Sequence, residues 1–375
     1  MYIGVSTSAY QNEEGCFNSD WYHWEKLGKV PKKGDANKSY KEFKKDIDLL
    51  KELGVNAYRF SIEFSRIMPK KNKVDNEAIN HYKELIRLLK ENNIESFVTL
   101  WHYTLPYWIE EENGLESNKI FSYFMDYVKT LIYNEVLEGV KYIITLNEPS
   151  IVTLFGYLFG IYPPKKKNLF SYLKSVRNII KLHNILYSFL SEQGFKVSYA
   201  QNFSYYTSKL IIDYPLSLLL SYITEYNYLD EMKKDFVSIN YYGKIEPLEI
   251  IGRKGINESR FLSPKVAPEA LELVLRDLHY RYNLPIVITE NGISTKDENK
   301  RIKYIKDHIE IVKKFSNNKY RVSGYFYWTL EDNYEWTKGY TKTFGLFDRK
   351  RRPKKESVNF FKEEIKELKD LPNWI

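Results

Sequence analysis

The chain has 375 residues, which is enough for one large domain or two of average size. Its 57 basic and 49 acidic side chains give a formal net charge of +8. They are interleaved along most of the sequence, so we interpret the charge as a solvated surface and expect no nucleic-acid partner. Cys16 is the only cysteine, which excludes an intrachain disulfide and suits a reducing compartment.

The N-terminal residues MYIGVSTSAY lack the basic and then apolar pattern of a secretory signal. No apolar run in the sequence is long enough to span a membrane. We therefore expect a cytoplasmic protein without a membrane partner. The composition, with 33 Tyr but only 1 Cys and 4 Met, is compatible with a thermophilic source. The sequence leaves the oligomeric state open, including a homo-oligomer.

Short runs of β-branched and aromatic residues recur along the chain and predict strands. Several of them, such as YIITL and IVIT, are apolar at nearly every position. That pattern is typical of strands that are covered on both faces, as in a parallel sheet. The predicted strands are residues 2–6, 57–62, 96–100, 142–146, 196–201, 236–240, 287–289 and 324–329.

Longer amphipathic stretches lie between these runs and predict helices. Residues 40–54, for example, place Phe43, Ile47, Leu50 and Leu53 on one face and end in glycine. No linker rich in Gly, Ser or Pro divides the alternation. Eight strands alternating with helices predict one closed (β/α)8 barrel, a single domain over residues 1–375. The predicted helices are residues 40–54, 76–93, 119–137, 172–193, 215–233, 268–282, 301–315 and 355–369.

Two of the predicted strands end in a glutamate beside an amide. YIITLNEPS brings Asn147 and Glu148 to the end of the fourth strand, and IVITENG brings Glu290 and Asn291 to the end of the seventh. Either glutamate alone could be a surface residue in a turn. However, active groups of such barrels lie at the C-terminal strand ends, and burying two unpaired carboxylates is costly. Together they indicate a catalytic pair.

Cleavage of a glycosidic bond needs such a pair. One carboxyl protonates the leaving oxygen, and a second carboxylate acts at the anomeric carbon. A separation of about 5–5.5 Å allows direct attack and retention of configuration. The acid must stay protonated near neutrality while the nucleophile stays ionised, so the two sites need different environments.

Several segments together resemble glycoside hydrolase family 1, the β-glucosidase and β-galactosidase family. The resemblance includes Asn-Glu-Pro after the fourth strand, Glu-Asn-Gly after the seventh, and a Gln-x-Glu-x-Gly spacing seen in archaeal members. It implies a retaining mechanism without metal or cofactor, with Glu148 as general acid/base and Glu290 as nucleophile. The other matching segments are SAYQNEEG, SDWYHWE, AYRFSIEFSRIMP, LWHYTLPYWI, SINYYG and YFYWTLEDNYEWTKGYTKTFGLF.

The same resemblance implies a set of sugar-binding residues. Trp328 offers a flat face beneath a pyranose ring, and Phe344 matches an aromatic residue of the pocket. His102 could instead be a hydrogen-bonded core histidine, and Trp328 could be plain barrel packing. The residues that match the family's sugar-binding positions are Gln11, His102, Asn147, Glu335 and Trp336.

Arg59 and Tyr241 resemble the pair that contacts the nucleophile in this family. A cation and a phenol hydroxyl would hold Glu290 ionised. Arg59 could instead form a structural ion pair with Glu63. Tyr241 and Tyr242 face opposite ways along a strand, and we predict that Tyr241 is the one that points inward.

Two departures bear on the substrate. The chain is shorter than most family members, mainly between Pro164 and Phe236, where DYPLSLLLSYITEYNYLDEMKKD predicts a helix packed on the barrel or an apolar lip for the leaving group. Glu335 would repel a sugar phosphate, which favours neutral glycosides. The basic run RKRRPKKES resembles a family segment, which weakens any case for nucleic acid.

We therefore expect a small-molecule β-glycoside or oligosaccharide as substrate. The predicted reaction is hydrolysis of neutral β-glucosides, β-galactosides or β-fucosides, with transglycosylation as a competing outcome. A non-catalytic sugar-binding barrel is the alternative. The sequence leaves the sugar epimer, the leaving group and the length of the substrate open.

Overall fold

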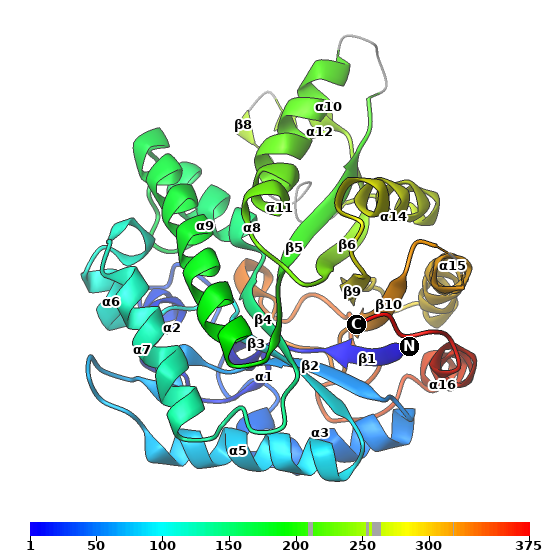
Figure 1. Cartoon of the computed structure of the whole chain (residues 1–375), viewed down its shortest axis with the longest axis horizontal. Helices are drawn as coiled ribbons and strands as arrows, with labels where there is room; N and C mark the ends of the chain where they lie inside the picture. The colour runs from blue at the N-terminus through cyan, green and yellow to red at the C-terminus, as the bar shows by residue number, and fades with distance from the viewer. Residues whose placement is uncertain (209–212, 253–254, 257–263, 318) are drawn as a thin grey trace.

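A closed barrel of eight parallel strands forms the centre of the computed structural model (Figure 1), which describes residues 1–208, 213–252, 255–256, 264–317 and 319–375. The strand order is β1-β10-β9-β6-β5-β4-β3-β2. Every predicted strand is present, and the predicted (β/α)8 barrel is confirmed. The barrel strands are β1 (Tyr2–Ser6), β2 (Ala57–Ser61), β3 (Glu95–Trp101), β4 (Tyr142–Asn147), β5 (Lys196–Tyr206), β6 (Val237–Ile245), β9 (Ile286–Asn291) and β10 (Val322–Trp328).

Helices connect the strands and surround the barrel (Figure 1). Local signals set their ends: Asp75 accepts the amides of Glu77 and Ala78 at the start of α5, and Gly54 ends α3 at a φ of 74°. Among the described residues, no helix is both long and apolar enough to cross a membrane. The long helices are α3 (Ser39–Leu53), α5 (Asn76–Glu91), α7 (Ile120–Tyr133), α9 (Leu169–Glu192), α14 (Pro268–Tyr282), α15 (Glu298–Ser316) and α16 (Lys355–Lys369).

Shorter elements occupy the loops of the barrel. Strands β7 (Ile251–Gly252) and β8 (Gly255–Ile256) pair with each other outside the barrel. The short helices are α1 (Ala9–Asn12), α2 (Asp20–Lys26), α4 (Phe64–Ile67), α6 (Tyr107–Glu111), η1 (Gly114–Glu116), α8 (Pro149–Thr153), η2 (Leu154–Leu158), α10 (Tyr214–Ser221), η4 (Tyr222–Tyr226), α11 (Asn227–Glu231), α12 (Pro247–Ile250) and η5 (Trp336–Lys338).

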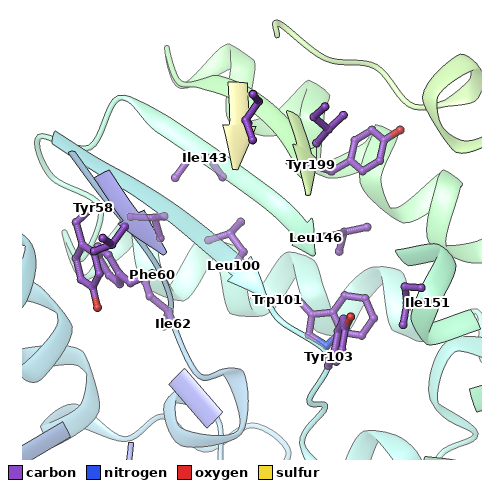
Figure 2. Packing of buried hydrophobic residues seen from close by; sticks show 14 of the residues in the cluster. Tyr58, Phe60, Ile62, Leu100, Trp101, Tyr103, Ile143, Leu146, Ile151 and Tyr199 are labelled. Atoms are coloured by element: carbon purple, nitrogen blue, oxygen red, sulfur yellow. The ribbon is translucent and has the colours of Figure 1, made fainter. Parts of the chain in front are cut away.

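Side chains alternate between the outside and the inside of the barrel. The outward ones pack against the helices, and Figure 2 shows part of that layer, with Phe60, Leu100, Ile143 and Tyr199 among them. The inward ones at the N-terminal half form an apolar plug, which is fully buried. The plug consists of Ala57, Phe97, Tyr142, Ile144, Ala200, Phe236, Val287 and Phe326.

Polar side chains also point into the barrel, some level with the plug and others above it, and those nearest the C-terminal strand ends position the site. Arg59, Ser198, Ser238 and Thr289 are all fully buried. They hydrogen-bond across strands: the Ser238 hydroxyl, for example, donates to the Ser198 hydroxyl at 2.9 Å. Of these four residues, Arg59 is the one that reaches the Glu290 carboxylate near the C-terminal end of β9.

The segment after β5 differs in part from the prediction of one continuous helix over residues 215–233. It forms α10, the π-helical turn η4 and then α11. Tyr228 and Leu229 of α11 are buried, as expected for a helix packed on the barrel. On α10, Leu218 and Leu219 are each 54% exposed, whereas Leu220 is partly buried and packs against the core, so α10 packs on the barrel with one part of its surface and exposes the rest.

Candidate active site

A pocket of about 230 Å³ opens at the C-terminal ends of the strands. Nine of the predicted site residues line it together. Arg59 lies beneath its floor and contacts two of them. The nine are Gln11, His102, Asn147, Glu148, Glu290, Trp328, Glu335, Trp336 and Phe344.

Glu290, near the end of β9, has a defined partner on each carboxylate oxygen. Arg59 Nη1 donates to Oε1 at 2.6 Å, and the Tyr242 hydroxyl donates to Oε2 at 2.7 Å. Burial raises the pKa of Glu290 to about 7, and the charge of Glu148 adds to the rise, whereas Arg59 and the Tyr242 hydrogen bond oppose it. The carboxyl of Glu290 is therefore poised between its two forms near neutrality.

Arg59 bridges three strands rather than pairing with Glu63. Its guanidinium donates to Asn147 Oδ1 at 2.6 Å, to Thr99 Oγ1 at 3.2 Å and to Glu290. The Glu63 carboxylate accepts instead from the Ser65 hydroxyl at 2.6 Å and also from Thr104. The alternative of an Arg59–Glu63 ion pair is thus wrong for this structure.

The prediction that Tyr241 points at Glu290 is wrong, because the neighbouring Tyr242 makes that contact. The Tyr241 ring lies outside the barrel, and its hydroxyl donates to the Ala267 carbonyl at 2.6 Å. Strand alternation fixes this parity: Ser238 and Asn240 face inward, so Tyr242 does as well. The polar residues at 238 and 240 were the signal that could have given the correct facing.

Glu148 follows β4 and precedes α8, with its backbone at a φ of 45°. Its Oε1 accepts from the side-chain amides of Asn240 at 2.8 Å and Asn202 at 3.2 Å. Its Oε2 accepts from the Tyr103 hydroxyl. Sequence reasoning missed all three donors. The rule of polar residues at strand ends could have found Asn202 and Asn240, but Tyr103 follows β3 within a loop.

A short hydrogen-bond chain links the two glutamates. Asn147 Oδ1 accepts from Arg59, which holds Glu290, and from Asn240 Nδ2 at 3.1 Å, which also holds Glu148. Movement of either carboxylate would therefore disturb the other. The two carboxylates therefore share one hydrogen-bond network, and the charge of Glu148 also acts on Glu290.

Gln11 and Glu335 lie on another wall of the pocket. Gln11 Nε2 donates to Glu335 Oε2 at 3.2 Å and to the Tyr334 carbonyl at 2.9 Å. Burial raises the pKa of Glu335 to about 8, and the charges of Glu290 and Glu148 add to it, while Lys342 opposes the rise. At neutral pH the protonated acid of Glu335 predominates, so this wall offers a donor as well as acceptors.

His102 and the tryptophans form an aromatic wall. Burial, and then the charge of Arg59, lower the pKa of His102 well below its ordinary value, so the imidazole is neutral. Its Nε2 lies 3.2 Å from Asn147 Nδ2. The centroid of the Trp328 ring lies 6.0 Å from that of the His102 ring, and the centroid of the Trp336 ring lies 6.1 Å from it; both pairs of rings are stacked. These flat apolar faces suit a sugar ring.

Other residues lining the pocket were not singled out in the sequence. Lys342 and Ser294 add polar groups, and Val266 is 48% exposed at an apolar part of the lining. Within the described part of the chain, no cluster of three or more His, Cys, Asp or Glu side chains has the arrangement of a metal site. The remaining lining residues are Tyr103, Tyr162, Asn202, Tyr242, Pro264, Gly292 and Ile293.

Comparison with known proteins gives one consistent family. The model of glycosyl hydrolase family 1 matches residues 1–208 and 200–370. Beta-glucosidase A of Thermotoga maritima is 29% identical, over 97% of this chain and 96% of the relative. The structure of a beta-glycosidase from Pyrococcus horikoshii has a TM-score of 0.88 and 30% identity, covering 99% of this chain and 97% of that one. A Thermotoga maritima beta-glucosidase in complex with castanospermine has a TM-score of 0.88 and 27% identity, covering 97% of each chain. The chain belongs to glycosyl hydrolase family 1 and is a glycoside hydrolase.

Proposed function

We propose that the chain hydrolyses neutral β-glycosides with retention of configuration. Glu290 attacks the anomeric carbon while Glu148 protonates the leaving oxygen, and a covalent glycosyl-enzyme forms. Glu148 then takes a proton from water, whose oxygen releases the sugar from Glu290. The observation that carries the proposal is the pair of buried carboxylates in one pocket, each with its own set of donors.

The two carboxylates have surroundings that suit these two roles. Glu290 faces a cation and a phenol hydroxyl, both of which favour the ionised form of a nucleophile. Glu148 faces only neutral donors, two amides and a phenol.

The remaining pocket residues then bind the sugar. Asn147 holds the 2-hydroxyl, a contact that strengthens as positive charge develops at the anomeric carbon. Gln11 and Glu335 bracket neighbouring hydroxyls, and His102 contacts another. Trp328 lies against the ring face, with Trp336 and Phe344 completing the pocket.

The names of the relatives favour β-glucosides as the first substrates to try, since the Thermotoga maritima protein is a beta-glucosidase. Galactosides and fucosides remain within the proposal, because Gln11 and Glu335 can serve either epimer. A second alcohol that reaches the glycosyl-enzyme before water would give transglycosylation. We also propose that residues 1–375 act as one domain, in the cytoplasm, where the buried thiol of Cys16 stays reduced.

The test is removal of the nucleophile. Glu290→Gly should abolish hydrolysis of 4-nitrophenyl β-glucoside, and azide or formate should restore part of it by attacking from the vacated side. Glu225→Gln is the matched control, because Glu225 is equally buried but accepts from the Ser204 amide outside the pocket. Full activity of Glu290→Gly without any added anion would end the proposal.

A fluorosugar separates the enzyme from a non-catalytic sugar-binding barrel. A 2-deoxy-2-fluoro β-glucoside with a dinitrophenyl leaving group should add one fluorosugar to Glu290, detected by intact mass and peptide mapping. A chain that binds sugars but has no nucleophile would show no added mass. An aryl β-glycoside panel of glucose, galactose, fucose, mannose and xylose would then rank the epimers.

A further inference from the structure

The two oxygens of Glu148 have partners of different chemical kinds. Oε1 accepts from two side-chain amides, Asn240 Nδ2 at 2.8 Å and Asn202 Nδ2 at 3.2 Å. Oε2 accepts from the hydroxyl of Tyr103. An amide nitrogen can only donate, whereas a hydroxyl can donate and accept. The two sides of the carboxyl are therefore not equivalent for a proton.

Oε1 is unsuited to carry the acid proton. The Thr289 hydroxyl donates to Asn240 Oδ1 at 2.8 Å and so fixes the orientation of the Asn240 amide. In that orientation Asn240 Nδ2 points at Oε1 of Glu148. Two donated hydrogen bonds occupy both lone pairs of Oε1, so it behaves as the carbonyl oxygen of the acid. The proton of Glu148 then belongs on Oε2, beside Tyr103.

The backbone conformation of Tyr103 holds its hydroxyl beside Oε2 of Glu148. Tyr103 has a φ of 73°, and the amide of Thr104 donates to the His102 carbonyl at 2.9 Å, so Tyr103 is the central residue of a γ-turn with positive φ. Such turns are rare and strained for residues other than glycine. The surrounding contacts maintain the turn.

Those contacts come from buried groups. The indole of Trp101 donates to the Thr104 carbonyl at 2.9 Å, and the Thr104 hydroxyl donates to the Glu63 carboxylate at 2.9 Å. The Tyr103 ring packs at 4.7 Å from the Trp336 ring. Figure 2 shows Trp101 and Tyr103 at the end of β3. The fold thus keeps an aromatic residue in a strained turn, and the result is a hydroxyl aimed at Glu148.

We propose that Tyr103 is a positioning residue that fixes the acid proton of Glu148 on Oε2 and stabilises the carboxylate left when that proton moves to the leaving group. This inference rests on the proposed function. In the first step, the bond from the anomeric carbon to the leaving oxygen breaks, a bond to Glu290 forms, and the proton on Oε2 goes to the leaving oxygen. Tyr103 keeps its own proton and donates it more strongly as Oε2 becomes anionic.

Two features support a phenol that keeps its proton. Burial raises the pKa of Tyr103 well above its ordinary value, and the charge of Glu148 raises it further.

In the second step, water returns a proton to Oε2, its oxygen bonds to the anomeric carbon, and the bond to Glu290 breaks. Tyr103 then weakens its donation as the charge on Oε2 disappears.

Dependence on the leaving group tests this role. A dinitrophenolate leaves without protonation, but phenolate and alkoxide need the acid. In Tyr103→Phe, kcat/KM for phenyl β-glucoside should fall about ten- to hundredfold, the usual effect of losing one hydrogen bond to a charged group. For 2,4-dinitrophenyl β-glucoside it should change less than about twofold. A plot of log kcat/KM against leaving-group acidity should become steeper.

The matched control is Tyr241→Phe, which removes a buried phenol hydroxyl that donates only to the Ala267 carbonyl outside the pocket. The rate of labelling by the dinitrophenyl fluorosugar checks that Tyr103→Phe is folded with a working nucleophile, since this step needs no acid. Labelling at the wild-type rate is the expected result.

Three outcomes would overturn the inference. If Tyr103→Phe matches Tyr241→Phe across the whole panel, the hydroxyl has no part in proton transfer. If all substrates and the labelling rate fall by the same factor, Tyr103 only supports the structure. If the wild-type chain neither hydrolyses any member nor takes the label, the proposed function fails, and the role of Tyr103 fails with it.

Discussion

Replacing Tyr242 by phenylalanine should move the acidic limb of the pH–activity profile to higher pH. The hydroxyl of Tyr242 donates to Glu290 Oε2 at 2.7 Å and is one of the causes that lower the pKa of this carboxyl, which burial raises to about 7. Phenylalanine keeps the ring and removes the donor. The ionised form of Glu290 therefore loses a partner, and its pKa rises.

The size of the shift follows from one hydrogen bond. A bond to a charged group contributes about 1.5–3 kcal/mol, and one pKa unit corresponds to about 1.4 kcal/mol, so the pKa of Glu290 should rise by about 1–2 units. In its proposed role as nucleophile, Glu290 must be ionised to attack, so activity should be lost as pH falls through this pKa. The acidic limb of kcat/KM, which reports the free enzyme, should shift upward by the same amount.

The assay is kcat/KM for 4-nitrophenyl β-glucoside between about pH 4 and pH 10. This range covers the acidic limb of the wild type and the limb of the variant, which is expected at higher pH. Because Glu148 and Glu290 interact, the fitted values belong to the pair, and the comparison with wild type carries the result. Tyr241→Phe is the control with the neighbouring hydroxyl removed instead. An acidic limb that stays in place, or that moves to lower pH, would refute the reasoning about Tyr242.

Three further perturbations test other parts of the structure. Arg59→Met leaves the Glu290 carboxyl and the Asn147 oxygen without their cation, so urea unfolding at pH 7 should show a loss of at most about 3–5 kcal/mol, and an unchanged unfolding free energy would contradict the bridge. Glu331 is fully buried, and burial followed by the charge of Asp46 raises its pKa to about 9, against the opposing charge of Arg351. Between about pH 4.5 and pH 9, Glu331 therefore holds a proton in the folded chain that the unfolded chain has released, so the stability of the wild type falls as pH rises. Glu331→Gln should flatten this decline in urea titrations at pH 5, 7 and 9. If the unfolding free energies of the variant and the wild type decline in parallel, the reasoning is refuted. Gly4→Ala would place a Cβ only 2.2 Å from the Ala57 carbonyl oxygen between β1 and β2, so the melting temperature should drop by several degrees, whereas Gly28→Ala, where no atom lies within 4 Å, isolates the cost of a positive φ alone.

The barrel could be predicted from the sequence because its signal is repeated. Each strand is a short apolar run followed by an amphipathic helix, and β1 has the predicted bounds, Tyr2–Ser6. Local pattern could not give the length of β5, which continues to Tyr206 because β6 pairs with it well beyond the barrel interior. It also missed the break between α10 and α11, since a π-helical turn has no simple periodic signature.

The candidate site was predictable where strand ends position a residue. Glu148 and Glu290 follow apolar runs, and the structure brings them to one pocket. The prediction that Tyr241 rather than Tyr242 points into the barrel was wrong, because two adjacent tyrosines do not show which of them faces inward. The inward-facing polar residues Ser238 and Asn240 decide it, since they have the same strand parity as Tyr242. The role of Tyr103 could not be anticipated, because it depends on a strained turn that only tertiary contacts maintain.

The apolar plug of the barrel has a consequence for traffic through the site. Since side chains such as Phe97, Tyr142 and Phe326 seal the lower end, sugar, leaving group and water all have to use the upper opening. In the proposed mechanism, the departing group must clear this opening before water can take its place opposite Glu290. An alcohol that lingers there competes directly with water, so the ratio of transfer to hydrolysis should follow how slowly the first product departs.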